Sequence, residues 1–179
     1  MNEKGYEIVK AYRQSVPAMR FIGKKYGDSD RVKGGFGFQW GQWFQNGWFE
    51  VIEKSCGQEK LNSLYEDGGA YIGLMRHKDG EPFEYWIGIF APASAIVPEG
   101  FGYIDFPAAD LGTCWVKGKE NKIYCHEGEC AKRLNAEGME LASDGKSTPI
   151  GFFERYGCPR FTTPDENGEI ILDICFFIK

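Results

Sequence analysis

Residues 150–156 read IGFFERY and residues 170–178 read IILDICFFI, with Asp165-Glu166-Asn167-Gly168 between them. Short apolar and aromatic runs on either side of turn residues indicate strands. Asn-Gly is the strongest short signal for a hairpin. We therefore predict that the two runs are the strands of a β-hairpin.

A strand and a helix precede this hairpin along the chain. Residues Gly102–Val116 contain a strand pattern, which Pro107 should break or bulge because proline has no backbone N–H to donate. Residues Asn121–Glu137 predict a helix, with Asn121 as its N-cap and Gly138 just after its end.

The first half of the chain repeats this order. Its predicted elements are a strand pattern from Tyr6 to Ile22, a turn at Gly27-Asp28-Ser29-Asp30, a helix over Phe36–Cys56, and strands near Ala70–His77 and Phe83–Phe90. Large apolar residues recur every three or four positions in the helix, and Gly57 is a suitable stop. Asp79-Gly80 is a hairpin signal between the two strands.

Two halves of the same element order, about 1–92 and 97–179, predict an α+β fold. Residues 91–100 are small and proline-bearing, as connectors are. A single half could bury only one face of its sheet. We expect the duplicated strand-helix-strand-strand halves to form one antiparallel sheet, with two main helices on one face and a ligand cleft between the halves. We expect one domain to fill residues 1–179, with no DNA-binding domain.

Composition limits the partners. The net charge is −5 and no basic stripe is present, which argues against a nucleic-acid partner and favours a neutral or cationic ligand. No apolar run approaches the roughly 18 residues of a membrane span, and the polar N-terminus lacks a signal-peptide core. We expect a cytoplasmic protein without a membrane partner, in which the six cysteines are free thiols.

Several short motifs resemble the GyrI-like small-molecule-binding domains, which include the effector-binding domains of multidrug-responsive AraC- and MerR-type regulators. The motifs are Val97-Pro98-Glu99-Gly100, Ile104-Asp105-Phe106-Pro107-Ala108-Ala109, Phe152-Phe153-Glu154-Arg155-Tyr156 and Glu169-Ile170-Ile171-Leu172-Asp173-Ile174. The resemblance is strongest from residue 83 onward. Such domains often follow a helix-turn-helix domain, whereas here we expect the domain to fill the chain, as a stand-alone form. One departure is the final strand, which ends Cys175-Phe176-Phe177-Ile178 where the family commonly has a Tyr-Ile-Pro-like sequence.

Glu154 is the principal candidate site residue. Side chains alternate along a strand, so Phe152, Glu154 and Tyr156 should share one face. A carboxylate among aromatic rings has a raised pKa unless it is paired, and such groups are candidate functional sites. The resemblance implies that Glu154 lies at the floor of a ligand pocket. An exposed glutamate on a strand is the alternative.

Aromatic residues of the first half are the other candidates. Trp40, Trp43 and Phe44 lie on one predicted helix, and we expect at least one of them to reach the cleft, where ring faces attract cations. Tyr71 and Trp86 lie on strands that should face the same cleft. Core packing is the alternative for each of these residues.

We predict neither a metal nor a cofactor. The segment Cys125-His126-Glu127-Gly128-Glu129-Cys130 offers soft ligands, but its two cysteines are five positions apart, about 140° off one face of a helix. His77 is the only other histidine. Adjacent residues on a helix diverge, so Cys125 and His126 do not predict a nucleophilic pair.

Three functions remain open. The first is a stand-alone protein that binds bulky aromatic or cationic drug-like molecules. The second is suggested by stand-alone GyrI-like proteins that resemble hydrolases opening reactive cyclopropane rings, with Glu154 as the general base and Tyr156 orienting the substrate or water. The third is an interaction module with a regulator or DNA gyrase as partner, which predicts an exposed apolar patch.

Overall fold

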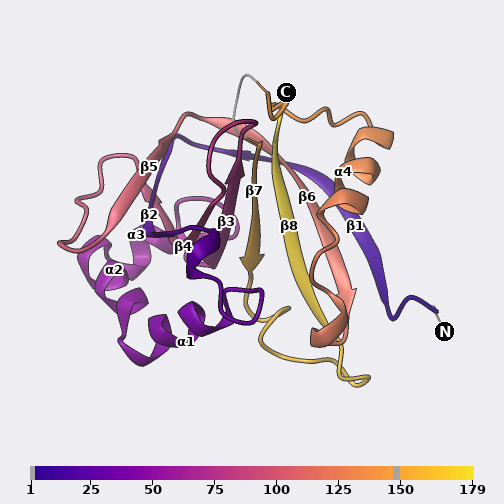
Figure 1. The fold of residues 1–179 in the computed structure, drawn as a ribbon, viewed down its shortest axis with the longest axis horizontal. Helices are drawn as coiled ribbons and strands as arrows, with labels where there is room; N and C mark the ends of the chain where they lie inside the picture. The colour runs from indigo at the N-terminus through magenta and orange to yellow at the C-terminus, as the bar shows by residue number, and fades with distance from the viewer. Residues whose placement is uncertain (1–2, 147–149) are drawn as a thin grey trace.

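The computed structural model describes residues 3–146 and 150–179, and one eight-stranded antiparallel sheet organises them in the order β1-β6-β8-β7-β3-β4-β2-β5 (Figure 1). The strands are β1 (Tyr6–Val16), β2 (Met19–Tyr26), β3 (Tyr71–His77), β4 (Glu84–Pro92), β5 (Gly102–Phe106), β6 (Ala109–Gly118), β7 (Ile150–Tyr156) and β8 (Ile170–Ile178). The α+β class, the antiparallel sheet and the terminal hairpin are as predicted.

Each half contains one more strand than the sequence pattern indicated. Two consecutive strands, rather than one, precede the helical segment of each half, and Pro17 and Pro107 lie in the links between them. The first strand of each half also pairs outside its own half. β1 lies against β6, and β5 lies against β2. The central contact between the halves is the β3–β7 pair, which runs from Tyr71 opposite Tyr156 to His77 opposite Ile150.

The predicted helix over Phe36–Cys56 is two helices, α1 (Gly37–Gln45) and α2 (Trp48–Cys56). Gly47 separates them with φ +64°, a left-handed conformation that glycine adopts without steric cost. A short helix α3 (Gln58–Asn62), which the sequence did not indicate, follows Gly57.

The helical segment of the second half is also interrupted. A 3₁₀ turn η2 (Glu120–Lys122) precedes helix α4 (Glu127–Ala136), and Cys125 has φ +65° between them. The N-cap is therefore His126, so the prediction of Asn121 at that position was wrong. Gly138 follows the helix with φ +82°, as expected for a C-terminal stop. The predicted turn at 27–30 contains a second 3₁₀ turn, η1 (Asp28–Asp30).

The helices cover one face of the sheet. Tyr71 and Met75 of β3 pack in the cluster formed with α1, α2 and α3, and Phe152 and Tyr156 of β7 pack in the cluster formed with α4. Because Tyr71 is paired with Tyr156 and Met75 with Phe152, both clusters lie on the same face.

The other face of the sheet is closed by its own curvature. Pro17 and Ala18 alone join β1 and β2, although these strands are first and seventh in the sheet order. Two residues span only about 10 Å, so the sheet must curl to bring these strands together. The rings of Phe106 on β5 and Phe177 on β8 accordingly stack with centroids 4.9 Å apart. Phe153 is fully buried in the cluster inside this curl.

The six cysteines are free thiols, as expected. Within residues 3–146 and 150–179, no helix combines the length and apolar character needed to cross a membrane.

Candidate functional site

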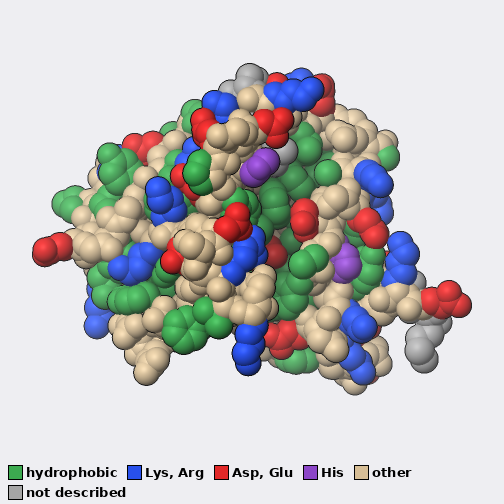
Figure 2. Space-filling model, in the orientation of Figure 1, with side chains coloured by type: hydrophobic (Ala, Val, Ile, Leu, Met, Phe, Trp, Pro, Cys, Tyr) green, Lys and Arg blue, Asp and Glu red, His purple; other side chains and the backbone are tan. Residues whose placement is uncertain are grey.

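A cavity of about 1120 Å³ opens on the helical face of the sheet, above the β3–β7 pair, and residues of both halves line it. Figure 2 shows hydrophobic side chains in the hollow between the two helical regions, with acidic side chains near its edge. Most of the large lining side chains are aromatic. They are Phe36, Trp40, Phe44, Tyr71, Phe83, Tyr85, Tyr124, Tyr156 and Phe161. This is the cleft that the order of elements predicted.

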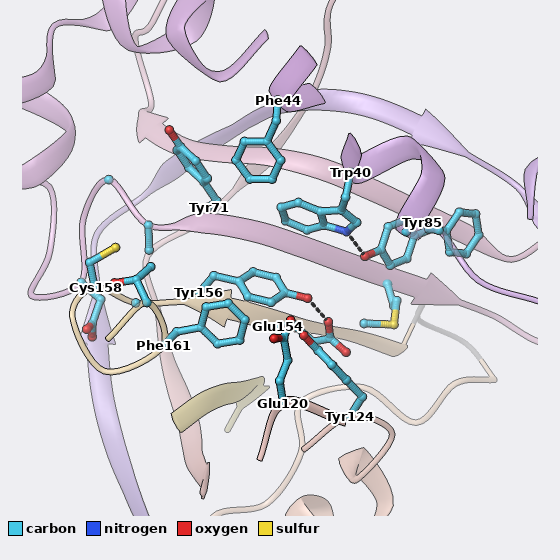
Figure 3. Close-up of a pocket in the computed structure, with 18 of the residues that line it drawn as sticks. Trp40, Phe44, Tyr71, Tyr85, Glu120, Tyr124, Glu154, Tyr156, Cys158 and Phe161 are labelled. Carbon is cyan, nitrogen blue, oxygen red and sulfur yellow. Dashed lines mark hydrogen bonds between the residues drawn. The ribbon is translucent and has the colours of Figure 1, made fainter. Parts of the chain in front are cut away.

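Glu154 faces the interior of this cavity from β7 (Figure 3). The Tyr156 hydroxyl donates a hydrogen bond to Glu154 Oε2 at 2.5 Å. Burial raises the pKa of Glu154 to about 7, an effect that the Tyr156 hydrogen bond opposes and the charge of Glu127 reinforces. The carboxyl group is therefore held near the midpoint of its titration at neutral pH.

No basic side chain of the described residues forms an ion pair with Glu154. The cavity is acidic as a whole, since it is also lined by Glu53, Glu66, Asp67 and Glu120. Arg31 is the only basic residue among the described residues that line it, and its Nε donates to Asp28 at 2.9 Å. The uncompensated charge in the cavity is thus negative, which favours a cationic occupant.

Aromatic residues from both halves enclose Glu154. Trp40 Nε1 of α1 donates to the Tyr85 hydroxyl at 2.8 Å, and the Trp40 and Tyr156 rings meet edge to face with centroids 4.8 Å apart. Phe161 meets Tyr156 in the same manner at 4.7 Å. Burial raises the pKa of the Tyr85 and Tyr156 hydroxyls and brings that of Tyr124 to about 12. These phenols stay protonated at neutral pH and can donate hydrogen bonds.

Gly73 makes room for this arrangement. It is the residue of β3 paired with Glu154. A Cβ atom at this position would lie 2.8 Å from the Tyr85 hydroxyl oxygen and 3.4 Å from Cζ2 of Trp40. A side chain here would displace the hydrogen-bonded Trp40–Tyr85 pair beside Glu154.

A second carboxylate–phenol pair lines another part of the cavity. The Tyr71 hydroxyl donates to Glu53 Oε1 at 3.0 Å, and burial raises the pKa of Glu53. The Tyr71 ring stacks on Phe49 of α2 with centroids 3.7 Å apart. The ring centroids of Phe44 and Tyr71 lie 6.1 Å apart, and Phe44 is 60% exposed, so it forms part of the cavity rim.

Five of the eight residues singled out from the sequence lie at this cavity. They are Trp40, Phe44, Tyr71, Glu154 and Tyr156. The other three pack elsewhere. Trp43 is fully buried and donates to the Tyr26 hydroxyl at 3.1 Å, because α1 directs Trp40 rather than Trp43 towards the cavity. Trp86 lies on the opposite face of the sheet, where it packs edge to face with Phe21.

Phe152 shares the face of Glu154, as alternation predicted, but does not line the cavity. Its ring stacks on Phe176 of the neighbouring strand with centroids 5.3 Å apart, and it packs against the core under α4. It therefore supports the sheet beside the cavity.

Other lining residues had not been singled out. Tyr85 could have been found from its position, because alternation places it opposite to Trp86 and on the face of Tyr71. Tyr124 lies in the interrupted segment before α4, where the sequence suggested a regular helix, and Glu120 immediately precedes that predicted helix. Phe161 lies in the loop after β7, and no periodicity marks its direction.

The cysteine-rich segment of the second half does not form a metal-ligand cluster. Cys125 lines the cavity, whereas Cys130 is fully buried beneath α4. Across the described part of the chain, no three His, Cys, Asp or Glu side chains converge as a metal site would require.

A buried ion network supports the cavity from behind. Arg155 of β7 is fully buried, and its Nε donates to Asp173 Oδ2 of β8 at 2.8 Å. Arg155 Nη2 also lies 3.0 Å from Asp67 Oδ2. Arg160 forms ion pairs with both Asp67 and Asp173. Asp67 itself lines the cavity. The network thereby fixes the loop between α3 and β3 to the end of β7.

The fold is that of a set of solved structures that share the α+β sheet with this chain. No protein-family model matches the sequence, and no curated protein matches it. SAV2435, solved with bound tetraphenylphosphonium, superimposes with a TM-score of 0.65 at 13% identity, over 96% of this chain and 94% of that one. The C-terminal domain of EcmrR gives 0.57 at 13% identity, over 95% and 97%.

A third similar structure is a hydrolase encoded by lin2189 from Listeria innocua. It superimposes with a TM-score of 0.52 at 13% identity, over 95% of this chain and 92% of that one. Similarity at this level of identity establishes a shared fold across nearly the whole chain, and function has to be argued from the site.

Proposed function

We propose that this protein binds bulky hydrophobic cations in the cavity above the β3–β7 pair, with Glu154 as the counter-ion. The observation that carries the proposal is a carboxylate that faces an aromatic cavity without a basic partner among the described residues. Ionising such a group is unfavourable until a positive charge compensates it. A cation would provide that charge, and the surrounding rings would add about 0.5–2 kcal/mol each through cation–π contacts.

The size of the cavity also supports this proposal. Pockets for drug-sized molecules are usually about 300–1000 Å³, and this one is about 1120 Å³. A ligand of about 30 heavy atoms at about 0.3 kcal/mol each would gain about 9 kcal/mol, which corresponds to micromolar or tighter binding.

The fold comparisons support the same proposal by analogy. SAV2435 was solved with bound tetraphenylphosphonium, which is a lipophilic cation, and the C-terminal domain of EcmrR has the same fold. Together with the motif around Glu154, these likenesses favour membership of the GyrI-like ligand-binding domains. We accordingly infer a small-molecule-binding module that does not itself contact nucleic acid.

Calorimetric titration with tetraphenylphosphonium tests the proposal. We expect micromolar binding to the unaltered protein and at least a tenfold weaker affinity for Glu154→Gln, because that variant keeps the shape of the side chain and removes its charge. Glu59→Gln on α3 removes an exposed charge outside the cavity and should bind as the unaltered protein does. Equal affinity of Glu154→Gln and the unaltered protein would refute Glu154 as the counter-ion.

Hydrolysis is the second candidate function, and the Glu154–Tyr156 pair is the observation that favours it. A carboxylate with a pKa of about 7 is suited to accept a proton from water at neutral pH, and Tyr156 donates to that same carboxylate. In ring opening, the water oxygen would bond to a cyclopropane carbon and one ring C–C bond would break. Glu154 would take one proton from the water, and the electron pair released from the broken bond would take a proton from solvent.

Product analysis by mass spectrometry separates the two functions. A cyclopropane-bearing alkylating compound incubated with the protein should gain the mass of water if the protein is a hydrolase. Glu154→Gln should then still bind the compound but fail to convert it. Binding without any mass change would leave the binding module as the function.

A further inference from the structure

Two carboxylate–phenol pairs diverge from the middle of the cavity floor. Tyr71 and Tyr156 are direct partners across the β3–β7 pair. Their hydroxyls nevertheless reach different carboxylates, Glu53 of α2 at 3.0 Å and Glu154 of β7 at 2.5 Å. Figure 3 shows the Tyr71 hydroxyl pointing away from Glu154 while the Tyr156 hydroxyl points towards it. The two carboxylates therefore lie at separate places along the cavity, with the two rings between them.

Glu53 shares with Glu154 the features that distinguish a ligand counter-ion. It is half-buried, and no basic side chain of the described residues forms an ion pair with it. The remaining acidic residues of the lining differ. Glu66 and Glu120 are exposed, and Asp67 is already paired with Arg155 and Arg160.

The aromatic surface between the two carboxylates is continuous. Trp40 contacts Tyr156 at a centroid distance of 4.8 Å and Phe44 at 6.4 Å, and Phe44 contacts Tyr71 at 6.1 Å. These rings connect the Glu154 end of the cavity to the Glu53 end. The cavity of about 1120 Å³ is also larger than one compact cation requires.

We propose that the preferred ligands are elongated aromatic dications, with one cationic head beside Glu154, the other beside Glu53, and an apolar linker along the rings of Trp40, Phe44 and Tyr156. This inference rests on the proposed cation-binding function and specifies its ligand class. Each head would neutralise one carboxylate, and linking the two heads in one molecule makes the second contact intramolecular, which raises affinity without new contacts elsewhere.

A matched pair of probes tests this inference. The dication is two N-linked quinolinium rings joined by a ten-carbon chain, and the monocation is N-decylquinolinium, which has the same ring and the same chain with one charge. Dissociation constants are measured by calorimetry for the unaltered protein, Glu53→Gln and Glu154→Gln. Glu50→Gln is the control, because Glu50 lies on the same helix, is exposed and does not line the cavity.

We expect the dication to bind the unaltered protein at least tenfold more tightly than the monocation. Glu53→Gln should reduce that preference to within about twofold and leave monocation binding nearly unchanged. Glu154→Gln should weaken both probes, and Glu50→Gln should preserve the preference. Thermal unfolding of each variant verifies that it is folded.

Two outcomes overturn the inference in distinguishable ways. In the first outcome, monocation binding depends on Glu154, but the dication binds no more tightly than the monocation, or the tighter binding of the dication survives Glu53→Gln. The dication preference is then refuted and the cation site stands. If neither probe binds, or if Glu154→Gln changes neither affinity, the proposed function fails and the inference fails with it.

Discussion

The affinity for a cation of fixed charge should depend on pH through Glu154. With a pKa of about 7, the carboxyl group is about 90% ionised at pH 8 and about 3% ionised at pH 5.5. A ligand that requires the carboxylate would bind about 30 times more weakly at the lower pH. A charge-assisted contact contributes about 1.5–3 kcal/mol, or roughly 10- to 100-fold in affinity. The loss of affinity expected from ionisation and the loss expected from the contact energy therefore agree.

Tetraphenylphosphonium is the appropriate probe because its charge does not titrate. We expect its dissociation constant to rise about 10- to 30-fold between pH 8 and pH 5.5, with most of the rise below pH 7. The phenols around Glu154 do not contribute, since burial raises the pKa of Tyr85, Tyr124 and Tyr156. Glu53 is a second carboxyl group of the cavity whose pKa is raised by burial.

Glu154→Gln separates these two carboxyl groups. The variant should show a nearly flat affinity from pH 5.5 to 8, with any residual slope assigned to Glu53. Fluorescence titration of the cavity tryptophan, Trp40, supplies the dissociation constants at each pH. A pH-independent affinity in the unaltered protein, or the same slope in Glu154→Gln, would refute the assignment.

Three further outcomes are expected. Without ligand, the raised pKa of Glu154 favours the folded state fully below about pH 4.5, and this contribution is lost as the pH rises through 7. Urea denaturation at pH 8 should therefore find Glu154→Gln more stable than the unaltered protein by at most about 3 kcal/mol. The difference is smaller where cavity water screens the charge. Arg155→Met removes one partner of the buried Asp173 and should lower the unfolding free energy by about 3 kcal/mol in the same assay, whereas a loss below 1 kcal/mol would contradict a structural role for the network. Gly73→Ala should weaken tetraphenylphosphonium binding at least tenfold, because the new Cβ would lie 2.8 Å from the Tyr85 hydroxyl; unchanged affinity would show that this side of the cavity can yield.

The hairpin strands of each half and the turns between them could be predicted because local signals mark them. Asn167-Gly168 and Asp79-Gly80 lie between strands whose partners follow in sequence. The division of the first helix could not, because the apolar spacing continues through Asn46 and Gly47 and favours one uninterrupted helix. Only the packing of α1 and α2 shows that Gly47 adopts a left-handed conformation. The same limit explains the missed turn at Cys125.

Part of the cavity lining could be predicted from the sequence. Motif and alternation together pointed to Glu154 and Tyr156, and both line the cavity. Trp40 and Trp43 could not be separated, since residues three apart on a helix lie only about 60° from each other around its axis and the rotation of α1 is set by its tertiary contacts. The expectation that Trp86 faces the cleft was wrong: its neighbour Tyr85 lines the cavity, and adjacent residues of a strand point to opposite faces.

The exchange of first strands between the halves has a consequence for how the protein can be divided. β1 completes the sheet edge of the second half, and β5 completes that of the first. A cut in the connector between β4 and β5 would therefore give two fragments that each carry a strand belonging to the other. Neither fragment could close its own sheet, so the two should be unstructured apart and regain structure only on mixing, with the cavity reappearing at the same moment as the fold.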